Sequence, residues 1–333
     1  MNRVDSSPPI LVTGAAGRHG GTGRRIVELL RQKGRPVRAM VRKMDERCAD
    51  LVQLGAEVVV ADYMDYEALC LALSGVKRAY FCFPVNVGIT EATVNFVAAA
   101  KASCLEYVVN NSMPIAHPAS PSPLARAQWM SEQILNWSGL RCLHVKGAFF
   151  FENILLFSED TIVDRGVIEN GFGDAPLLWV AADDVASVAA YELEQADPAQ
   201  NPAILVTGGE LLAFPQIAER ISSRLGRKVG YRNTGDDEEA WKKLMSLNPR
   251  IPPAMRDHLV GMSRMLKSVR DPRQPGNTFT PLLGKPAVSF DDFLDTHRAR
   301  LLRAMEVSSQ GHNREVHPTQ ERKTQNESEQ HWK

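Results

Sequence analysis

The sequence predicts an α/β protein, in which a doubly wound parallel sheet has helices on both faces and is followed by a smaller C-terminal α/β region. Three observations predict this class. Short apolar segments alternate with amphipathic or alanine-rich ones through the first half of the chain. Several of the short segments are almost uniformly apolar, which is typical of parallel strands buried on both faces. A glycine-rich turn separates the first of them from the first helix.

The first strand, turn and helix occupy residues 10–30. An apolar run at residues 10–12 leads into the glycines, and apolar residues then recur at helical spacing through Leu30. In this context the glycines have three roles: they allow a tight turn, close approach of the backbone to a pyrophosphate, and close packing of the helix against the sheet. The positive N-terminal end of the helix then faces the phosphates. The stretch therefore predicts a dinucleotide site rather than a glycine-rich surface turn, with either Gly20 or Gly23 as the third glycine. The loop residues expected to contact the cofactor are Gly14, Ala16, Gly17, His19, Gly20, Gly21 and Gly23.

The other strands and helices of the sheet follow in alternation. The expected strands are short apolar runs, most of them ending at a polar residue or a proline, at residues 37–41, 57–61, 78–83, 106–110 and 141–145. The expected helices are amphipathic or rich in alanine, at residues 66–73, 90–101 and 124–137. With the first strand and helix, these elements predict a Rossmann-type nucleotide-binding domain over residues 8–150.

Beyond residue 150 the alternation is less regular. The expected elements are one strand at residues 203–206 and helical segments at residues 183–193, 214–225, 236–269 and 290–305. We expect residues 151–305 to form a smaller substrate-covering region that is interleaved with the first domain. Residues 306–333 are polar and lack periodicity, so ordering them would bury too little apolar surface to offset the entropy lost. A disordered tail is expected there.

Composition excludes several classes of protein. The formal net charge of zero argues against a nucleic-acid binder, which would normally show a basic excess. The five cysteines are scattered and form no CxxC, which favours buried thiols in a reducing compartment. Neither a signal peptide nor a long apolar span is visible, and no His/Cys cluster suggests a metal. We expect a cytoplasmic, soluble monomer or homodimer that binds a small-molecule substrate, without metal, nucleic acid or membrane.

Two cations follow the second expected strand. Many NAD-binding proteins place an acidic residue there, against the ribose 2′-hydroxyl, whereas this chain has Arg42 and Lys43. They suit a 2′-phosphate, which favours NADP(H) over NAD, although a solvated basic strand end would look the same. Asp62 closes the third strand, where the adenine would lie, and either accepts from the adenine amino group or caps the following turn. Phe83 and Pro84, at the end of the fourth strand, are also expected to contact the cofactor.

Several segments together resemble the NmrA-like proteins, a branch of the atypical short-chain dehydrogenases/reductases. They are TGAAGxxG, AMVRK, GAEVVVADYMD and SGLRCLHVKGAFFFENI, and LGKPAVSFDDFLDTHR extends the resemblance over roughly residues 8–303. The resemblance implies a Rossmann domain that binds NADP(H) and a smaller C-terminal part that closes over a substrate cleft. The family includes working reductases, of the isoflavone-reductase-like and quinone- or azo-reductase-like types, and catalytically silent redox sensors.

The residues able to move protons depart from the usual pattern. Short-chain reductases usually use Tyr-x-x-x-Lys, with the tyrosine as acid, but none of the six tyrosines here has a lysine four residues on. Many NmrA-like proteins keep a single lysine on the helix after the fifth strand. Counting back from Ser138-Gly139-Leu140, the matching residue is Gln128, which can hydrogen-bond a ribose or a carbonyl but cannot act as a cationic acid.

Three further residues are candidates for the site. Ser112 follows the fifth expected strand, where short-chain folds place a substrate-polarising hydroxyl; the alternative is a turn-forming serine. Lys146 stands where the family usually shows the arginine of Arg-Pro-Gly, and it either reaches the cleft or pairs with a nearby acid. Phe149 is the first of three phenylalanines where the chain crosses the nicotinamide end, and one of the three is expected to stack near the ring.

The leading hypothesis is an NADPH-dependent oxidoreductase of the NmrA-like type that acts on a small apolar carbonyl, enone or quinone. Its candidate catalytic residues are Ser112, Gln128 and Lys146. Two alternatives stay open because the tyrosine–lysine pair is missing. One is a catalytically silent NADP(H) sensor whose nucleotide changes its contacts with a regulatory protein partner. The other is a non-redox cyclase or isomerase that uses the same pocket.

Overall fold

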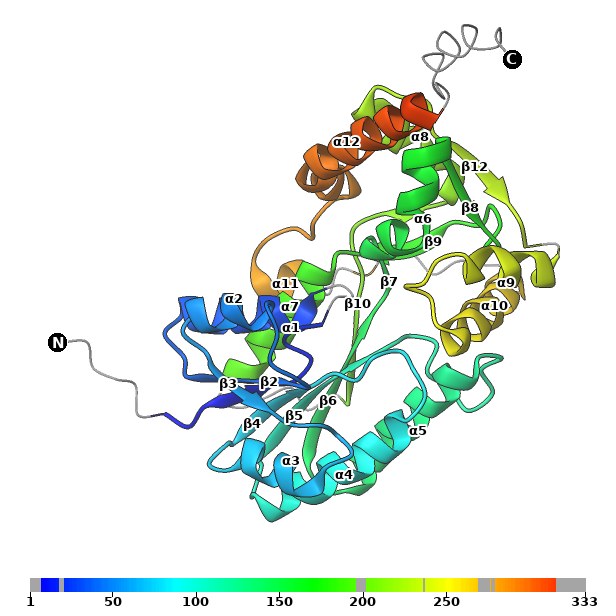
Figure 1. Cartoon of the computed structure of the whole chain (residues 1–333). Coiled ribbons are helices and arrows are strands. Elements are labelled where there is room, and N and C mark those ends of the chain that lie inside the picture. Colours follow the sequence, from blue (N-terminus) through cyan, green and yellow to red (C-terminus); the bar gives the residue numbers. More distant parts are fainter. Residues whose placement is uncertain are drawn as a thin grey trace, which may run out of the picture.

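The centre of the molecule is a seven-stranded parallel sheet (Figure 1). The computed structural model describes residues 7–17, 21–195, 202–235, 237–268, 276 and 279–315. The strands of the sheet, in the order in which they lie side by side, are β10 (Ala203–Val206), β6 (Arg141–Gly147), β5 (Tyr107–Ser112), β4 (Arg78–Phe81), β1 (Ile10–Val12), β2 (Val37–Val41) and β3 (Glu57–Val60). Every neighbouring pair is parallel, which confirms the predicted fold class.

Helices cover both faces of this sheet (Figure 1). The core on one face includes side chains of α1 (Thr22–Gln32), α2 (Cys48–Gln53), α7 (Ala182–Glu194) and α11 (Phe279–Leu283). The core on the other face includes side chains of α3 (Tyr66–Leu73), α4 (Ile89–Ala102) and α5 (Pro123–Trp137). The strand order reverses between β1 and β4, and ligands of such sheets bind at this switch point, beyond the carboxyl ends of the strands.

Two strands run further than the sequence predicts. The fifth was expected to end at residue 110 and the sixth at residue 145, but β5 reaches Ser112 and β6 reaches Gly147. Ser112 therefore lies within a strand and not in a turn after it. The extension has a simple cause, because the polar ends of β5 and β6 pair with each other, and Ser112 lies opposite Lys146 in the register.

The smaller C-terminal region has its own hydrophobic core. It contains two short sheets and five helices among the described residues: β7 (Phe149–Phe150), α6 (Glu152–Arg165), β8 (Val167–Asn170), β9 (Leu177–Val180), β11 (Leu211–Leu212), α8 (Phe214–Leu225), β12 (Gly230–Asn233), α9 (Glu238–Ser246), α10 (Pro253–Ser268) and α12 (Phe290–Glu315). Aromatic rings fill this core, where Phe151 stacks on Trp179 with centroids 5.9 Å apart and Phe172 stacks on Phe214 at 5.7 Å.

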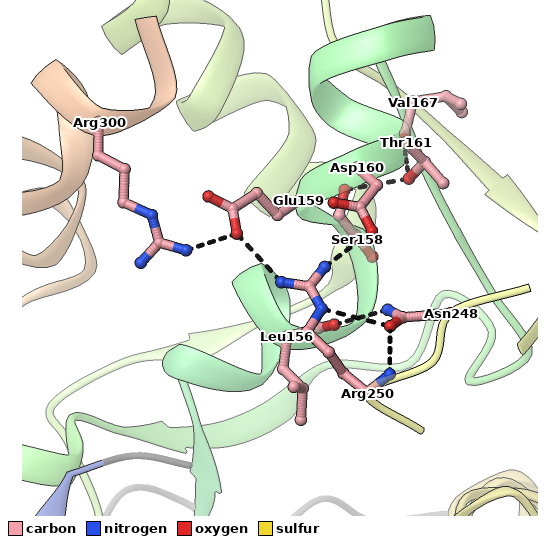
Figure 2. Close-up of polar contacts among 9 residues, drawn as sticks. All are labelled: Leu156, Ser158, Glu159, Asp160, Thr161, Val167, Asn248, Arg250 and Arg300. Carbon is pink, nitrogen blue, oxygen red and sulfur yellow. Dashed lines mark hydrogen bonds and ion pairs between the residues drawn. The ribbon is translucent and has the colours of Figure 1, made fainter. Parts of the chain in front are cut away.

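One buried carboxylate of α6 joins three parts of this region (Figure 2). Glu159 accepts from Arg300 of α12 at 2.5 Å and from Arg250, which precedes α10, at 3.3 Å. Asn248 donates to the Leu156 carbonyl at 2.9 Å and fixes the same segment against α6. These contacts hold α6, α12 and the α9–α10 connection together.

Elements from beyond residue 150 complete the main sheet. The helix α7 packs against α1, and β10 pairs with β6. The division at residue 150 stays a prediction. The last helix, α12, continues to Glu315, whereas the sequence predicted its end at Met305 and a disordered tail from residue 306. Residues 306–315 contain no proline, and the glutamates, the glutamine and the arginine among them favour a helix, whereas Gly311 disfavours one. Residues 316–333 lie outside the described part, in which no helix is long and apolar enough to cross a membrane.

Candidate functional site

The end of β1 is tied to the end of β4 at the switch point. The Thr13 hydroxyl donates to the Tyr80 carbonyl at 2.9 Å and accepts from the Cys82 N–H at 2.8 Å. Gly14 follows with φ +66°, a left-handed conformation that favours glycine, and a Cβ there would lie 3.4 Å from the Cys82 Cβ and carbonyl oxygen. The chain thus turns sharply above the sheet.

Gly23 has the close packing contact expected of the third glycine. A Cβ at this residue would lie 2.7 Å from the Gly14 carbonyl oxygen, which no real side chain tolerates without a shift of the backbone. A Cβ at Gly17 would lie 3.0 Å from the same oxygen. The other candidate for the third position, Gly20, lies outside the described residues, as does His19.

The N-terminus of α1 is suited to an anion. Its cap residue, Gly21, has φ 68° and provides no side-chain hydrogen bond, and the first turn contains no acidic residue. The N–H groups at a helix start carry partial positive charge and bind phosphates when no side chain occupies them. We call this end of α1, together with Gly14, Gly17, Gly21 and Gly23, the glycine cradle. Its surface is formed by backbone atoms, and side chains at Gly17 and Gly23 would crowd the Gly14 carbonyl.

Three cations follow β2. Arg42 and Lys43 are exposed, as expected of residues that meet a ligand or solvent. Arg47 was not predicted, and it contacts the glycine loop directly, because its Nη1 donates to the Ala16 carbonyl at 2.5 Å. Asp45 holds the guanidinium in place, with Arg47 Nε 3.0 Å from its Oδ1, and Arg47 in turn lowers the pKa of the Asp45 carboxyl. The only sequence signal for Arg47 was a third cation close after the strand.

The carboxyl ends of β3 and β4 present apolar surface. The Asp62 carboxylate accepts from the Met64 N–H at 3.0 Å, so it caps the following turn, which was one of its two predicted roles. Phe83 and Met64 both approach Gly88, since a Cβ there would lie 3.7 Å from the Phe83 ring and 3.4 Å from the Met64 methyl. Met64 is 46% exposed. Pro84 follows Phe83 directly. This surface suits the flat face of a purine.

A buried polar network occupies the adjacent ends of β5 and β6. The Ser112 hydroxyl donates to Glu132 Oε1 at 2.5 Å, and Lys146 Nζ lies 2.9 Å from Oε1 and 3.0 Å from Oε2 of the same carboxylate. The Glu132 side chain is 5% exposed and that of Lys146 20%. Two predicted residues thus meet at a third that the sequence analysis missed. Glu132 is 20 residues from Ser112 and 14 from Lys146, so no local pattern indicated it.

Gln128 lies one helical turn before Glu132 on α5. Its amide donates to the Asn111 carbonyl at 3.4 Å, and the Asn111 side chain donates to the Cys82 sulfur at 3.6 Å. Cys82 packs beneath Gly14, so these contacts connect the glycine cradle to Asn111, the residue before Ser112, and to Gln128. The buried Asn111 Oδ1 has no hydrogen-bond partner in the described structure. An orphaned acceptor at this place fits a ligand that brings N–H or O–H donors.

Phe149 lies on the C-terminal side of the site. Its ring packs against Trp179 with centroids 4.9 Å apart and against Phe172 at 5.4 Å. The ring is half-buried, whereas Phe151 is buried completely. Of the predicted residues, Ser112, Gln128 and Lys146 form one group and the loop glycines another, with Cys82 and Asn111 between them. No group of three metal-ligating side chains occurs among residues that the structure describes.

The doubly wound sheet, with a glycine cradle at its switch point, defines a dinucleotide-binding protein of the Rossmann type. The chain belongs to the NmrA-like family, which matches residues 6–299.

Reductases are among its relatives. The NAD(P)H azoreductase of Xenophilus azovorans is 26% identical over 292 residues, which are 87% of this chain and 98% of the relative. The (4-alkanoyl-5-oxo-2,5-dihydrofuran-3-yl)methyl phosphate reductase of Streptomyces griseus subsp. griseus is 31% identical over 290 residues, 86% of this chain and 97% of the relative. The NADPH-dependent quinone oxidoreductase of Escherichia coli, in a crystal structure with NADPH, has a TM-score of 0.71 at 25% identity and covers 86% of this chain and 99% of its own.

Proposed function

We propose that this protein is an NADPH-dependent oxidoreductase that reduces a small apolar carbonyl, enone or quinone. The observation that carries the proposal is the contact path from the glycine cradle through Cys82 to Asn111, the residue next to Ser112 at the carboxyl end of β5. A reductase needs a nucleotide cradle and a polar group for the substrate oxygen within one site. The three relatives named above are all reductases, which supports the same conclusion.

The residues of the site fit NADP(H). The cradle of Gly14, Gly17 and Gly23, with the start of α1, would hold the pyrophosphate. Arg42 and Lys43 would hold the 2′-phosphate. When bound, the cofactor supplies the hydride, and the protein contributes binding, orientation and a proton.

Arg47, which already lies on the loop, would join Arg42 and Lys43 in holding the 2′-phosphate. The surface formed by Met64 and Phe83 would take the adenine, and the orphaned Asn111 Oδ1 would accept from the nicotinamide end.

The substrate oxygen would lie at Ser112. The hydroxyl is at the carboxyl end of β5, and its proton is held by Glu132. Gln128 offers an amide nearby, and Phe149 brings an aromatic wall from the C-terminal region. An apolar wall opposite one polar group suits a substrate that has a carbonyl on a mostly apolar body.

One observation favours a second function. The helix position that resemblance assigns to a lysine holds Gln128, which cannot donate a proton as a cation. A silent NADP(H) sensor would need the cradle but not the proton donor. The sensor and the non-redox cyclase or isomerase are therefore the alternatives to be tested. Monomer or homodimer assembly, a regulatory protein partner and a cytoplasmic location stay predictions.

The deciding experiment has two steps. The purified protein is first titrated with NADPH, NADP and NADH, and NADPH consumption is then followed against a panel of quinones and enones. Tight NADPH binding with turnover is the expected result. Tight binding without turnover would favour the sensor or the non-redox enzyme. If none of the three nucleotides binds, the proposal is wrong, because it requires the glycine cradle to bind NADP(H).

A further inference from the structure

The network of Ser112, Glu132 and Lys146 contains a hydroxyl in addition to an ion pair. Each residue comes from a different element, β5, α5 and β6, and all three meet at one carboxylate. Glu132 Oε1 is bound by both Ser112 and Lys146, and Oε2 is bound by Lys146 as well. The serine end of the network is the last residue of β5, directly after Asn111, whose side chain contacts Cys82 beneath Gly14. The lysine end retains contact with solvent.

The chemistry of the three groups allows a proton to move along this path. A lysine ammonium can release a proton, whereas an arginine guanidinium in the same place cannot. Oε1 of the Glu132 carboxylate contacts both neighbours, so it can take a proton from the lysine and pass the same proton to the serine oxygen, and a hydroxyl can accept one proton while it donates another. Each step in the path spans 3.0 Å or less between the donor and acceptor atoms.

We propose that Lys146, Glu132 and Ser112 form a proton relay that protonates the carbonyl oxygen of the substrate. This inference rests on the proposed function. As the hydride reaches the carbonyl carbon, or the far end of the conjugated system in an enone or quinone, the C=O π electrons move to the oxygen, and this oxygen takes the proton of the Ser112 hydroxyl. Ser112 is refilled by a proton from Glu132, which receives one from Lys146.

The proton balance of the relay closes. Ser112 ends as a hydroxyl and Glu132 as a carboxylate, as they began, and Lys146 ends as a neutral amine. The partly exposed amine regains its proton from water. The substrate gains one hydride and one proton and becomes an alcohol, an enol or a hydroquinone. Only Ser112 touches the reacting atoms, and the other two residues act through it.

The test compares wild type with Lys146→Arg. Arginine keeps the positive charge and can pair with Glu132, but it cannot give up its proton. We expect the kcat of the variant to fall by about 100-fold or more, the usual contribution of a general acid. The solvent deuterium isotope effect on kcat should change as well. The KM for the substrate, the affinity for NADPH and the melting temperature should stay close to wild type.

Lys101→Arg is the matched control. Lys101, in the last turn of α4, is exposed and donates to the Ser138 carbonyl at 2.7 Å rather than to a residue of the network, so its replacement should keep full activity. Ser112→Ala is a second test, and it leaves the Lys146–Glu132 ion pair in place. Its loss of kcat should equal that of Lys146→Arg within a few-fold. Ser112→Thr, which keeps a hydroxyl, should retain most of the wild-type kcat.

The outcomes separate the relay from the proposed function. If wild type turns over and Lys146→Arg has the same kcat and isotope effect, the relay is overturned and the reductase stands. If Lys146→Arg loses NADPH affinity or thermal stability in proportion to its activity, the network is structural and the relay is again overturned. If wild type binds NADPH tightly but reduces no acceptor, the proposed function fails and the relay falls with it.

Discussion

Single atoms determine what the nucleotide cradle can accommodate. The Gly14 carbonyl oxygen is the point that both Gly17 and Gly23 approach, and the Ala16 carbonyl oxygen accepts from Arg47. The first two contacts require the absence of a Cβ, and the third requires a long cation from 31 residues further along the chain. Residue-scale changes here should therefore affect both nucleotide binding and the packing of the loop against α1.

Gly23→Ala should weaken NADPH binding and the fold together. The new Cβ would lie 2.7 Å from the Gly14 carbonyl oxygen, so the loop or α1 must move. We expect a loss of about 1–3 kcal/mol in the free energy of unfolding, as is usual for overpacking, measured by urea denaturation. Gly209→Ala is the control, because no atom lies within 4 Å of its added Cβ. Equal stability and NADPH affinity in the two variants would show that the close contact does not matter.

Arg47→Gln should reduce the affinity for NADPH by about tenfold, since a charged hydrogen bond to a phosphate contributes roughly 1.5–3 kcal/mol. The affinity for NADH, which lacks the 2′-phosphate, should change less. Isothermal titration with both nucleotides checks this. An equal loss for NADPH and NADH would mean that Arg47 only shapes the loop through its contact with Ala16.

At the scale of elements, the sequence predicted the central strands and the first helix, which follow from local apolar patterns. It did not predict the residues whose contacts form only when distant elements pair. The central strands were found because they are apolar throughout, and the first helix because its glycines and apolar spacing agree. The short helix α2 was missed. Glu132 and Arg47 were missed because their partners lie 14 to 31 residues away, and such contacts exist only after β5, β6 and the glycine loop have been assembled.

Glu159→Gln should loosen the junction of α6, α12 and the segment before α10. The carboxylate is 8% exposed and accepts from both Arg250 and Arg300 (Figure 2). Because the two arginines are partly exposed, we expect a loss of about 1–3 kcal/mol in the free energy of unfolding rather than the larger value of a fully buried pair. Asp160→Asn is the control: its side chain is 62% exposed, so its effect should stay within about 0.5 kcal/mol. Equal effects would contradict the role given to burial.

At the scale of the whole molecule, buried histidines and buried carboxyl groups change the stability of the fold in opposite directions as the pH changes. Burial lowers the pKa of His144 to about 4 and that of His258 to about 4, so both rings stay neutral and their contribution is lost as pH falls from about 6.5 through 4. Burial raises the pKa of Glu152 to about 7 and that of Asp184 to about 6. These carboxyls keep their protons in the folded state, so they stabilise it at low pH and this contribution is lost as pH rises through those values.

Glu152→Gln should therefore steepen the rise of stability with pH. The variant lacks the group whose contribution declines between about pH 4.5 and 7, whereas the histidines still gain over the lower part of this range. Urea denaturation at pH 5, 6, 7 and 8 measures the free energy of unfolding of both proteins. The value for the variant minus the value for wild type should increase up to about pH 7. Parallel curves for wild type and variant would show that Glu152 titrates normally.

The return of α7 and β10 to the main sheet has a consequence for the growing polypeptide. When the ribosome has made β6, one side of this strand is still unpaired, and β10 pairs with it only after residue 206 has emerged. The face beside α1 stays bare until α7 follows, and α7 contributes fully buried side chains such as Val185 and Val188 to it. An unpaired edge next to exposed apolar surface invites pairing between neighbouring chains. A nascent chain halted between β6 and β10 would be a client for chaperones, although the nucleotide loop had been translated long before.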